Sequence, residues 1–376
     1  MALRRRTRWL IVLTLAALAI GAWWINRQLE PHRLTTLVLA KAGDALQLDL
    51  RYSGEPDYAL KPEPRLLIPN LEVRGRSDGE IFLSAKRAEI SLPWDTITGG
   101  EPVITRIELD TPVIDIPGLR RWLATRPPTP FKLPTLTRGV HLTDGSVHDA
   151  NYSLSKLSLD LPRLKTGEAA EVTTAGVFTQ GKTSVDFKAF LTAATPGLAS
   201  DFTLSGSGAL LQSDKPLPFK LHADGHYLSD DNAFSIEAKS LALEATSPLP
   251  SLDGKAGFKL GERMDFRLDG VLAHWPEDWP ALPQPIATHA DKLPFVLSYS
   301  GASDLGDPLH LQLAQDATRL QASLQLAQMQ GWLASSDGSP LPPLNATMQT
   351  PSLEFDGIKL EGVELEIRDS NGAPKP

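Results

Sequence analysis

Very few residues in this sequence combine the types and the spacing that chemistry requires. The first candidate is a metal site, because His222 and His226 flank Asp224 and such side chains bind metal ions. On an extended strand, residues four positions apart lie about 13 Å from each other, which is too far for one ion. A turn at Asp224-Gly225 would bring the histidines closer, but no further histidine cluster completes a ligand set. We therefore predict no metal site and no cofactor.

A second candidate is a phosphate-binding loop at residues 176–183, where the sequence GVFTQGKT fits the pattern G-x-x-x-x-G-K-T. That motif holds phosphate only where a strand precedes it and a helix follows it. Here the residues after Lys182 alternate between apolar and polar, with Val185 and Phe187 among the apolar ones, which is typical of a strand. We predict two strands joined near Gly181 and no nucleotide binding.

A catalytic nucleophile is not indicated either. The chain has no cysteine, which excludes a thiol nucleophile, disulfides and thiolate metal sites. The stretch Ser205-Gly206-Ser207-Gly208 lacks the spacing of a nucleophile elbow, and we interpret it as a bulge or turn within a strand. No constellation in the sequence meets the geometric requirements of catalysis. We predict that the protein is not an enzyme and has no catalytic residues.

Charge is distributed unevenly along the 376 residues, whose formal net charge is −8. The charged residues of segment 1–27 are all arginines, so the rest of the chain is more acidic than the total implies. Binding to nucleic acid needs a basic surface that neutralises phosphates, and we therefore exclude it. The 31 prolines are numerous for this length and argue against long helices, because an interior proline breaks helical hydrogen bonding.

The first 27 residues predict where the protein resides. An uncharged run of 17 residues, Trp9 to Ile25, is just long enough to span a bilayer. The basic flank before it favours a cytoplasmic N-terminus and a periplasmic body, and tryptophans mark both membrane interfaces. The residues assigned to this single-pass anchor are Arg4, Arg5, Arg6, Arg8, Trp9, Trp23 and Trp24. The alternative is a signal peptide cleaved after Ile20-Gly21-Ala22, which leaves the body in the same compartment.

After the anchor, one short helix precedes a long series of strands. Apolar residues from Leu34 to Val38 follow helical spacing, and Gly43 stands where that helix would end. From Ala45 onwards apolar and polar residues alternate with a period of two, which predicts strands with one apolar and one polar face. Short helices are expected at 118–126 and 276–282, and residues 316–333 fit either a strand or a helix. Asp-Gly pairs, which predict hairpin turns, begin at residues 78, 144, 224, 253, 269, 337 and 356.

This pattern predicts an all-β, mainly antiparallel fold with one N-terminal transmembrane helix and a few short helices. Helices do not alternate with the strands, which excludes a parallel α/β sheet. About 20 strands side by side at ~4.8 Å would form a sheet roughly 95 Å long, which curls or folds over itself. We expect an elongated curled sheet or trough, or a sandwich-like pair of sheets. The continuous apolar face needs cover from a second sheet or from a ligand.

The expected domain organisation follows the composition of the chain. The expected segments are a cytoplasmic stub and anchor at 1–27, a short amphipathic helix and linker at 28–44, an N-terminal β unit at 45–126, a proline-rich linker at 127–134, repeated antiparallel β units at 135–370 and a tail at 371–376.

The order of these features resembles the AsmA-like family of anchored periplasmic proteins. The resemblance rests on the N-terminal span, the short helix that ends near Gly43 and the strand Leu46–Tyr52. It continues through Pro69-Asn70-Leu71-Glu72-Val73, the stretch Leu83–Leu92 and the passage Gly99–Ile116. It covers residues 1–120 well, and residues 142–147 and 353–367 resemble the repeating strand units of the family.

This resemblance implies a fold and a function. Family members have a trough-like β structure lined by apolar residues and are implicated in moving phospholipid between the inner and outer membranes. The resemblance implies a protein of the bacterial inner membrane that binds phospholipid or another acyl-chain lipid, with an outer-membrane or periplasmic protein as a candidate partner. The residues expected to line its apolar groove are Leu46, Leu48, Leu50, Leu71, Val73, Ile90, Leu92, Leu159, Phe187, Phe219, Leu221, Phe234, Ile236, Leu243, Phe266, Leu268, Phe295, Leu297, Leu311, Leu360 and Leu365. The alternative function is a non-transporting envelope assembly factor or secretion-system component that acts through protein–protein contacts.

Overall fold

The computed structural model describes residues 35–36, 39–40, 43–44, 47–59, 61, 63–76, 79–94, 104–125, 133–211, 216–230, 233–276, 292–326, 328, 344–355 and 358–368. No helix within these ranges combines the length and the hydropathy that crossing a membrane requires. From residue 277 onwards, the helix expected at 276–282 lies outside these described ranges. Also outside them is the predicted anchor, with Arg4, Arg5, Arg6, Arg8, Trp9, Trp23 and Trp24.

The described chain consists mostly of β-strands, which confirms the prediction of an all-β fold. It divides into two compact units, residues 1–129 with 135–158 and residues 130–134 with 159–376. The boundary falls inside strand β8 (Ser153–Leu161), beyond the proline-rich segment at 127–134. Each unit has a hydrophobic core of its own.

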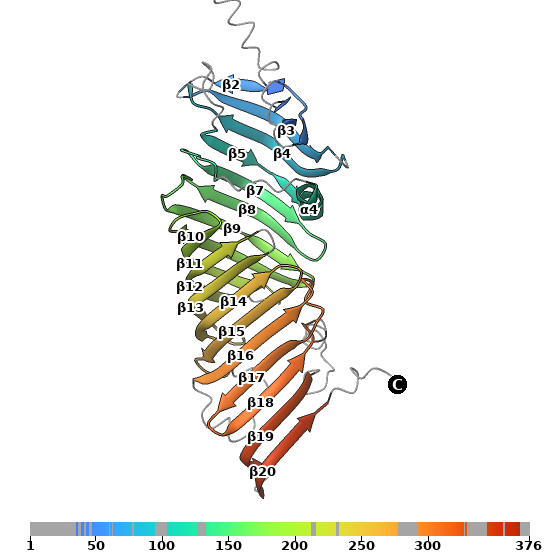
Figure 1. Cartoon of the computed structure of the whole chain (residues 1–376), viewed down its shortest axis with the longest axis vertical. Helices are drawn as coiled ribbons and strands as arrows, with labels where there is room; N and C mark the ends of the chain where they lie inside the picture. The colour runs from blue at the N-terminus through green and yellow to red at the C-terminus, as the bar shows by residue number, and fades with distance from the viewer. Residues whose placement is uncertain are drawn as a thin grey trace, which may run out of the picture. The chain divides into compact units, whose positions relative to one another are not determined.

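The sheet of the first unit is centred on β3 (Arg65–Gly75) and β4 (Ile81–Ser91), as Figure 1 shows. Strands β1 (Leu48–Arg51) and β2 (Asp57–Ala59) pair antiparallel with β3, and β5 (Arg106–Asp110) and β6 (Val113–Asp115) pair antiparallel with β4. Strand β7 (Val140–His148) runs parallel to β5 and β6, so the sheet is mixed. Parallel strands need a crossover connection, and the chain between β6 and β7 contains helix α4 (Ile116–Ala124).

Helix α4 confirms the short helix expected near 118–126, and it packs on the core of the first unit. The side chain of Asp115 caps its N-terminus, because Oδ2 accepts a hydrogen bond of 2.8 Å from the backbone nitrogen of Gly118. The Trp122 ring stacks on Phe82 with 5.3 Å between the ring centroids. Around this contact lies a closed core in which Ile68 has no exposed surface.

The described residues between Thr35 and Asp44 are helical, as predicted. Gly43, however, lies within this helical stretch and not beyond its end. A Cβ atom at Gly43 would come within 2.7 Å of the Leu48 carbonyl oxygen, so the glycine permits a close approach of β1. Leu39 packs into the core of the first unit from this stretch and helps to bury Leu48.

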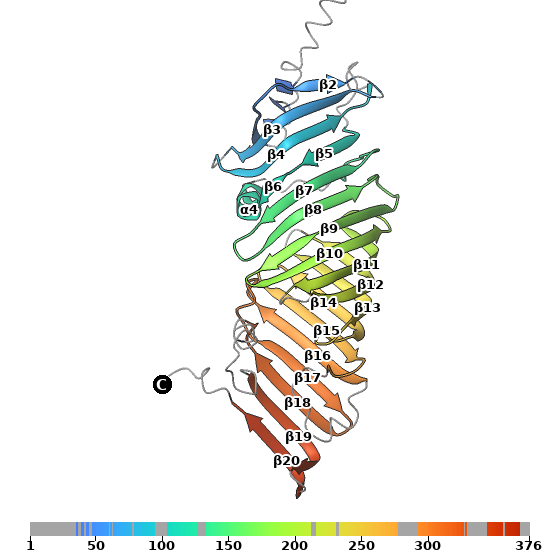
Figure 2. The same ribbon diagram turned by 180° about the vertical axis from the view of Figure 1, so that it is seen from behind.

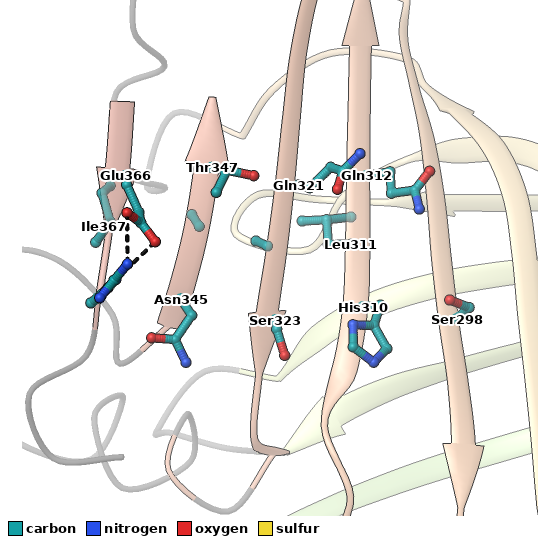
Figure 3. A pocket seen from close by; sticks show the side chains of 13 residues that line it. Ser298, His310, Leu311, Gln312, Gln321, Ser323, Asn345, Thr347, Glu366 and Ile367 are labelled. Atoms are coloured by element: carbon teal, nitrogen blue, oxygen red, sulfur yellow. Dashed lines mark hydrogen bonds and ion pairs between the residues drawn. The ribbon is translucent and has the colours of Figure 1, made fainter. Parts of the chain in front are cut away.

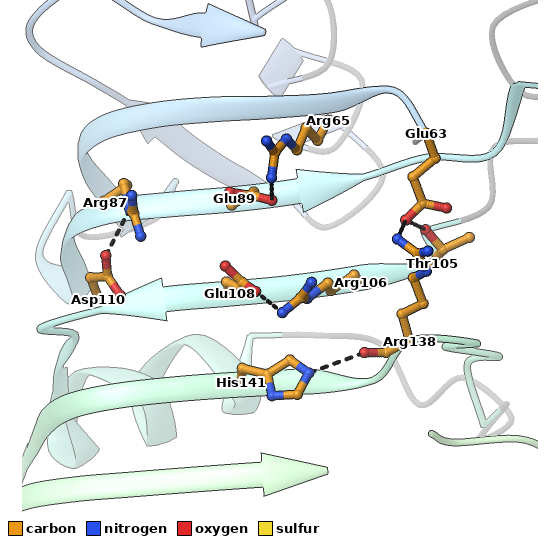
Figure 4. A network of polar contacts seen from close by, with 10 residues as sticks. All are labelled: Glu63, Arg65, Arg87, Glu89, Thr105, Arg106, Glu108, Asp110, Arg138 and His141. Atoms are coloured by element: carbon orange, nitrogen blue, oxygen red, sulfur yellow. Dashed lines mark hydrogen bonds and ion pairs between the residues drawn. The ribbon is translucent and has the colours of Figure 1, made fainter. Parts of the chain in front are cut away.

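Where β3, β4 and β5 pair, the face opposite the core is polar and carries paired charges (Figure 4). Glu89 on β4 and Glu108 on β5 are direct cross-strand neighbours, which is unfavourable for two like charges. Each carboxylate has an arginine, because Arg65 lies 3.4 Å from Glu89 and Arg106 pairs with Glu108. The side chain of Glu89 is only 7% exposed, so the loss of its partner would leave a nearly buried charge unpaired.

The second unit contains strands β9 to β20, each of which pairs antiparallel with the next. In Figure 1, β14 and β15 lie in front of β10 to β13, and the reverse view in Figure 2 exchanges them, so the sheet of this unit is curved. The strands are β9 (Ala170–Gln180), β10 (Thr183–Ala193), β11 (Ala199–Leu211), β12 (Leu217–Ser229), β13 (Phe234–Ala245), β14 (Leu252–Leu260), β15 (Met264–Leu272), β16 (Leu293–Gly301), β17 (Leu309–Gln315), β18 (Thr318–Leu324), β19 (Leu344–Phe355) and β20 (Ile358–Ile367).

The prediction that Asp-Gly pairs mark turns is wrong at 144, 224, 253 and 269, which lie inside β7, β12, β14 and β15. At the last of these pairs, Asp269 binds Arg267 at 2.7 Å on the polar face, while Gly270 belongs to the opposite, apolar face. A Cβ atom at Gly270 would come within 2.8 Å of the Phe295 ring on β16. The glycine therefore lies inside a strand because the Phe295 ring packs close to its backbone. The pairs at 337 and 356 lie outside the described residues.

Other expectations are resolved by the strand bounds. The chain turns at Gly181, whose φ is 59°, between β9 and β10, so the phosphate-loop pattern at 176–183 forms the predicted hairpin. The ambiguous stretch at 316–333 contains strand β18, followed by helical residues at 326 and 328. The apolar runs at 234–238 and 241–245 form the single strand β13, whose pairing with β14 shifts between Ala238 and Leu241.

Candidate functional site

One face of β10 to β13 carries large apolar side chains that are only half-buried. Alternation along each strand places them on one side of the sheet and exposed polar residues, such as Asp186 and Lys188 on β10, on the other. We name this surface the β10–β13 apolar face. Its residues are Val185, Phe187, Leu191, Phe202, Leu204, Phe219, Leu221 and Ile236.

Strand register joins these side chains into continuous rows. Leu191 on β10 lies opposite Leu204 on β11, which lies opposite Ala223 on β12 and then Leu241 on β13. Opposed residues in an antiparallel pair have Cβ atoms about 4.5–5.5 Å apart, so they contact one another along the row. Two rows away, the row that starts at Phe187 passes only through glycine, phenylalanine and alanine. The apolar surface therefore extends from strand to strand without a polar interruption.

A glycine lets an aromatic ring lie against the sheet within this face. A Cβ atom on Gly208 of β11 would come within 2.8 Å of the Cζ atom of Phe219 on β12. The ring therefore occupies the space beside the glycine backbone. Strand β11 pairs with β10 and β12 without any shift in register, so the prediction of a bulge or turn at 205–208 is wrong. Its glycines are apolar-face positions of a regular strand.

Further along the sheet, the same face is closed by packing. Residues of β14 to β19 form the hydrophobic cluster of the second unit, in which Leu293 has no exposed surface. Leu241 and Leu243 of β13 contact this cluster. Among the described residues, no side chain of β9 to β12 belongs to this cluster or to the core of the first unit. The buried members of the cluster are Leu252, Leu268, Leu272, Leu293, Phe295, Leu313 and Met348.

The structure distributes the predicted groove residues over several environments. Those in or against the core of the first unit are Leu48, Leu50, Leu71, Val73 and Ile90. Those in or against the cluster of the second unit are Leu243, Phe266, Leu268, Phe295, Leu297 and Leu311. Those on the β10–β13 apolar face are Phe187, Phe219, Leu221 and Ile236. Leu92 and Leu159 are half-buried elsewhere, Phe234, Leu360 and Leu365 are exposed, and Leu46 lies outside the described residues.

The predicted groove lining lacks four members of the β10–β13 apolar face, and for two of them, Phe202 and Leu204 on β11, the strand itself was not recognised. The signal was present, because Phe202, Leu204, Gly206 and Gly208 alternate with polar residues. Glycine at two of the four apolar-face positions hid the strand, since a period-two pattern is recognised by its large apolar side chains.

On the polar face of the same strands, the histidines are engaged separately. Asp224 accepts hydrogen bonds from Thr203 Oγ1 at 2.9 Å and Ser240 Oγ at 3.1 Å, and His222 Nε2 lies 3.1 Å from it. These contacts lower the pKa of Asp224, and the hydrogen bond from Thr203 contributes most. His226 Nδ1 lies 3.1 Å from Asp201 instead. Within the described part of the chain, no group of three or more His, Asp or Glu side chains could hold a metal ion.

Comparison with known proteins finds no match. No model of a protein family matches the chain, and neither curated proteins nor solved structures give a match. The β10–β13 apolar face therefore has to be interpreted from its own chemistry. It offers an uninterrupted apolar surface to a ligand that needs no hydrogen bonds.

Proposed function

We propose that this chain is a single-pass protein of the bacterial inner membrane whose periplasmic β body binds phospholipid or another acyl-chain lipid on the β10–β13 apolar face. Residues 9–25 are its anchor, and its role is in phospholipid transport between the inner and outer membranes or in outer-membrane homeostasis. The observation that carries the proposal is a contrast within one sheet. The large apolar side chains that β10 to β12 place on the β10–β13 apolar face, and Ile236 of β13, are half-buried outside the packed cluster, while Leu241 and Leu243 of β13 and the strands β14 to β19 contribute to it.

An acyl chain suits this face for a physical reason. Apolar surface that remains in contact with water is unfavourable, and each buried methylene of a ligand contributes about 0.8 kcal/mol. The rows across β10 to β13 offer no polar group that such a chain would have to desolvate. The N-terminal resemblance to the AsmA-like family supports the same ligand. We assign no catalytic step to the chain.

One edge of the sheet offers a route to this face. The edge meant here is formed by strand ends and not by an edge strand. The hairpins that join β10 to β11, β12 to β13 and β14 to β15 lie along it together, because successive strands pair antiparallel. Leu198, Leu228, Phe234 and Leu260 lie at this edge with 47%, 46%, 37% and 38% of their surface exposed. We propose that acyl chains enter across this edge, since exposed apolar clusters mark sites of lipid or protein contact.

The proposal is tested by placing the same charge on opposite faces of one strand. Leu204 is half-buried on the apolar face, and its neighbour Ser205 is exposed on the polar face of β11. The full-length chain is purified in detergent, and bound phospholipid is extracted and measured by mass spectrometry. Leu204→Glu is expected to lose most of the phospholipid that the wild type and Ser205→Glu retain, because a carboxylate is costly to bury beside acyl chains.

Equal phospholipid content in the three proteins would overturn the proposal. Circular dichroism checks that each variant retains its strands. If Leu204→Glu does not fold, Phe187→Gln replaces it, since Phe187 lies on the same face of the neighbouring strand.

The alternative, an assembly factor or secretion-system component, is favoured by a different observation. Leu360 and Leu365 on β20 are 45% and 42% exposed, and β20 pairs only with β19 among the described strands. An exposed strand edge with apolar side chains is suited to binding another protein. Co-purification of a stoichiometric protein partner, lost in Leu360→Asp and Leu365→Asp, together with absence of bound lipid would favour this function.

A further inference from the structure

The polar face of β16 to β20 contains a hollow of about 470 Å³ that the proposed lipid function does not use (Figure 3). It lies on the side of the sheet opposite the packed residues Leu313 and Met348. Its polar side chains come from alternate positions of five successive strands, and most of them are amides or hydroxyls. Leu311, Ala322, Ala346 and Ile367, which lie between them in the sequence, complete the lining. A hollow of this volume falls within the range of small-molecule sites, which is about 300–1,000 Å³.

Strand register arranges the polar side chains of this hollow in rows. One row leads from Gln312 on β17 through Gln321 on β18 and Thr347 on β19 to Glu366 on β20. Neighbouring strands lie about 4.8 Å apart, so the row presents one polar group at each such step. Gln312, Gln321 and Thr347 are exposed, which leaves them accessible to a ligand.

A second row runs beside the first. It leads from Ser298 on β16 through His310 on β17 and Ser323 on β18 to Asn345 on β19. Together the rows form a grid of groups that both donate and accept hydrogen bonds. In Figure 3 dashed lines end on Glu366, and none ends on the labelled side chains of Gln312 or Gln321.

The charges in the lining cancel. Arg368 donates from Nε and Nη2 to the two carboxylate oxygens of Glu366 at 2.8 and 3.0 Å. These hydrogen bonds lower the pKa of Glu366, which keeps the pair ionised and neutral overall near pH 7. A charged ligand would find no net opposite charge here, and an apolar one would desolvate the amides and hydroxyls without replacing their hydrogen bonds.

We propose that this hollow binds a neutral carbohydrate, an oligosaccharide that lies across strands β16 to β20. Sugar hydroxyls donate and accept hydrogen bonds, as do the amide, hydroxyl and imidazole groups of both rows. The spacing between strands is comparable to the length of one pyranose ring, so successive sugars meet successive members of a row. The site is independent of the β10–β13 apolar face, and neither proposal depends on the other.

The experiment is isothermal titration calorimetry of the full-length chain in a zwitterionic detergent that lacks a sugar headgroup. The probes are maltotriose and tri-N-acetylchitotriose, with a trisaccharide of galacturonic acid as the charged comparison. At least one neutral probe is expected to bind saturably. Gln321→Ala is expected to weaken that binding about tenfold, since one lost hydrogen bond to the ligand is worth about that factor.

Gln349→Ala is the matched control, because Gln349 lies on the polar face of β19 outside the hollow, where its Nε2 donates to Glu364 at 3.4 Å. It is expected to leave the affinity unchanged. Three results would overturn the proposal: no saturable heat with either neutral probe, an affinity that Gln321→Ala leaves unchanged, or tighter binding of the galacturonic acid trimer. Thermal melting of each variant checks that the fold is intact.

Discussion

The ring of Phe219 on β12 lies against the backbone of Gly208 on β11, within 2.8 Å of where a Cβ atom would stand. The pair joins the two central strands of the β10–β13 apolar face, in a row where phenylalanine and glycine alternate from β10 to β12. The same relationship recurs between Phe295 and Gly270 in the packed part of the unit.

Gly208→Ala is expected to destabilise the protein by about 1–3 kcal/mol, because the added methyl group overlaps the Phe219 ring and the Asp186 carbonyl oxygen. Urea denaturation followed by circular dichroism measures the free energy of unfolding. Gly257→Ala on β14 is the matched control, since a Cβ atom there meets nothing within 4 Å. It should change stability by less than about 0.5 kcal/mol. Equal effects would show that Phe219 does not occupy this space.

The two parts of the apolar face should differ in what a large-to-small substitution costs. Leu293→Ala, at a position with no exposed surface in the packed cluster, is expected to cost about 2–5 kcal/mol. Leu204→Ala on the half-buried part of the face should cost less than about 1.5 kcal/mol, because much of that side chain already contacts solvent. Denaturation of lipid-free protein measures both. A Leu204→Ala cost as large as that of Leu293→Ala would mean that β10 to β13 are packed like β14 to β19.

The polar face of the first unit should be sensitive to the loss of one arginine. Arg65→Met leaves the nearly buried Glu89 without its partner and is expected to cost about 2–3 kcal/mol. This is less than for a fully buried pair, because the Arg65 side chain is 41% exposed. The double variant Arg65→Met/Glu89→Leu should recover most of the loss.

Arg267→Met is the control for that experiment, since Arg267 and Asp269 form a solvent-exposed pair whose removal should change stability far less than the loss of Arg65 does. Thermal or chemical unfolding compares the variants. If the double variant is no more stable than Arg65→Met, the unpaired carboxylate is not the cause of the loss.

The hydrogen bonds to Asp224 predict a specific dependence of stability on acid pH. They lower its pKa from the usual 3.8 in the folded protein, so their contribution is present above that value and disappears as the pH falls through the lowered pKa. Thr203→Val removes the hydroxyl that contributes most. The stability difference between wild type and Thr203→Val should be constant near neutral pH and shrink below about pH 4.

Thr192→Val is the matched control for this pH profile, because Thr192 lies directly opposite Thr203 on β10. Its stability difference from wild type should not change between pH 7 and pH 3. A Thr203→Val difference that is equally flat would contradict the role assigned to the Thr203–Asp224 hydrogen bond.

Periodicity predicted the strands better than it predicted what covers them. Residues such as Val185 and Phe187 alternate plainly with polar neighbours, and their strand was predicted from that alternation alone. The Asp-Gly pairs misled, because aspartate can pair on the polar face while glycine makes room for a ring on the other, as at Gly270. The space for the Phe295 ring is visible only together with the neighbouring strand β16.

The parallel pairing of β7 with β5 and β6 was also beyond the sequence pattern, since alternation does not encode strand direction. For the candidate site, the sequence predicted an apolar face but not which part of it is packed. Leu243 and Leu221 have the same alternation and lie opposite each other on β13 and β12. Only Leu243 contacts the packed cluster, because contact depends on how strands distant in sequence meet.

Photocrosslinking from two phenylalanines of one strand can show whether lipid occupies the β10–β13 apolar face. Phe187 lies on the apolar face of β10, and Phe190 lies 42% exposed on its polar face. Each is replaced separately by the photoreactive p-benzoylphenylalanine in the full-length chain, cells are illuminated, and adducts are identified by mass spectrometry. Phospholipid adducts are expected at position 187 and none above background at position 190. No lipid adduct at 187, or equal adducts at both positions, would contradict lipid occupancy of this face.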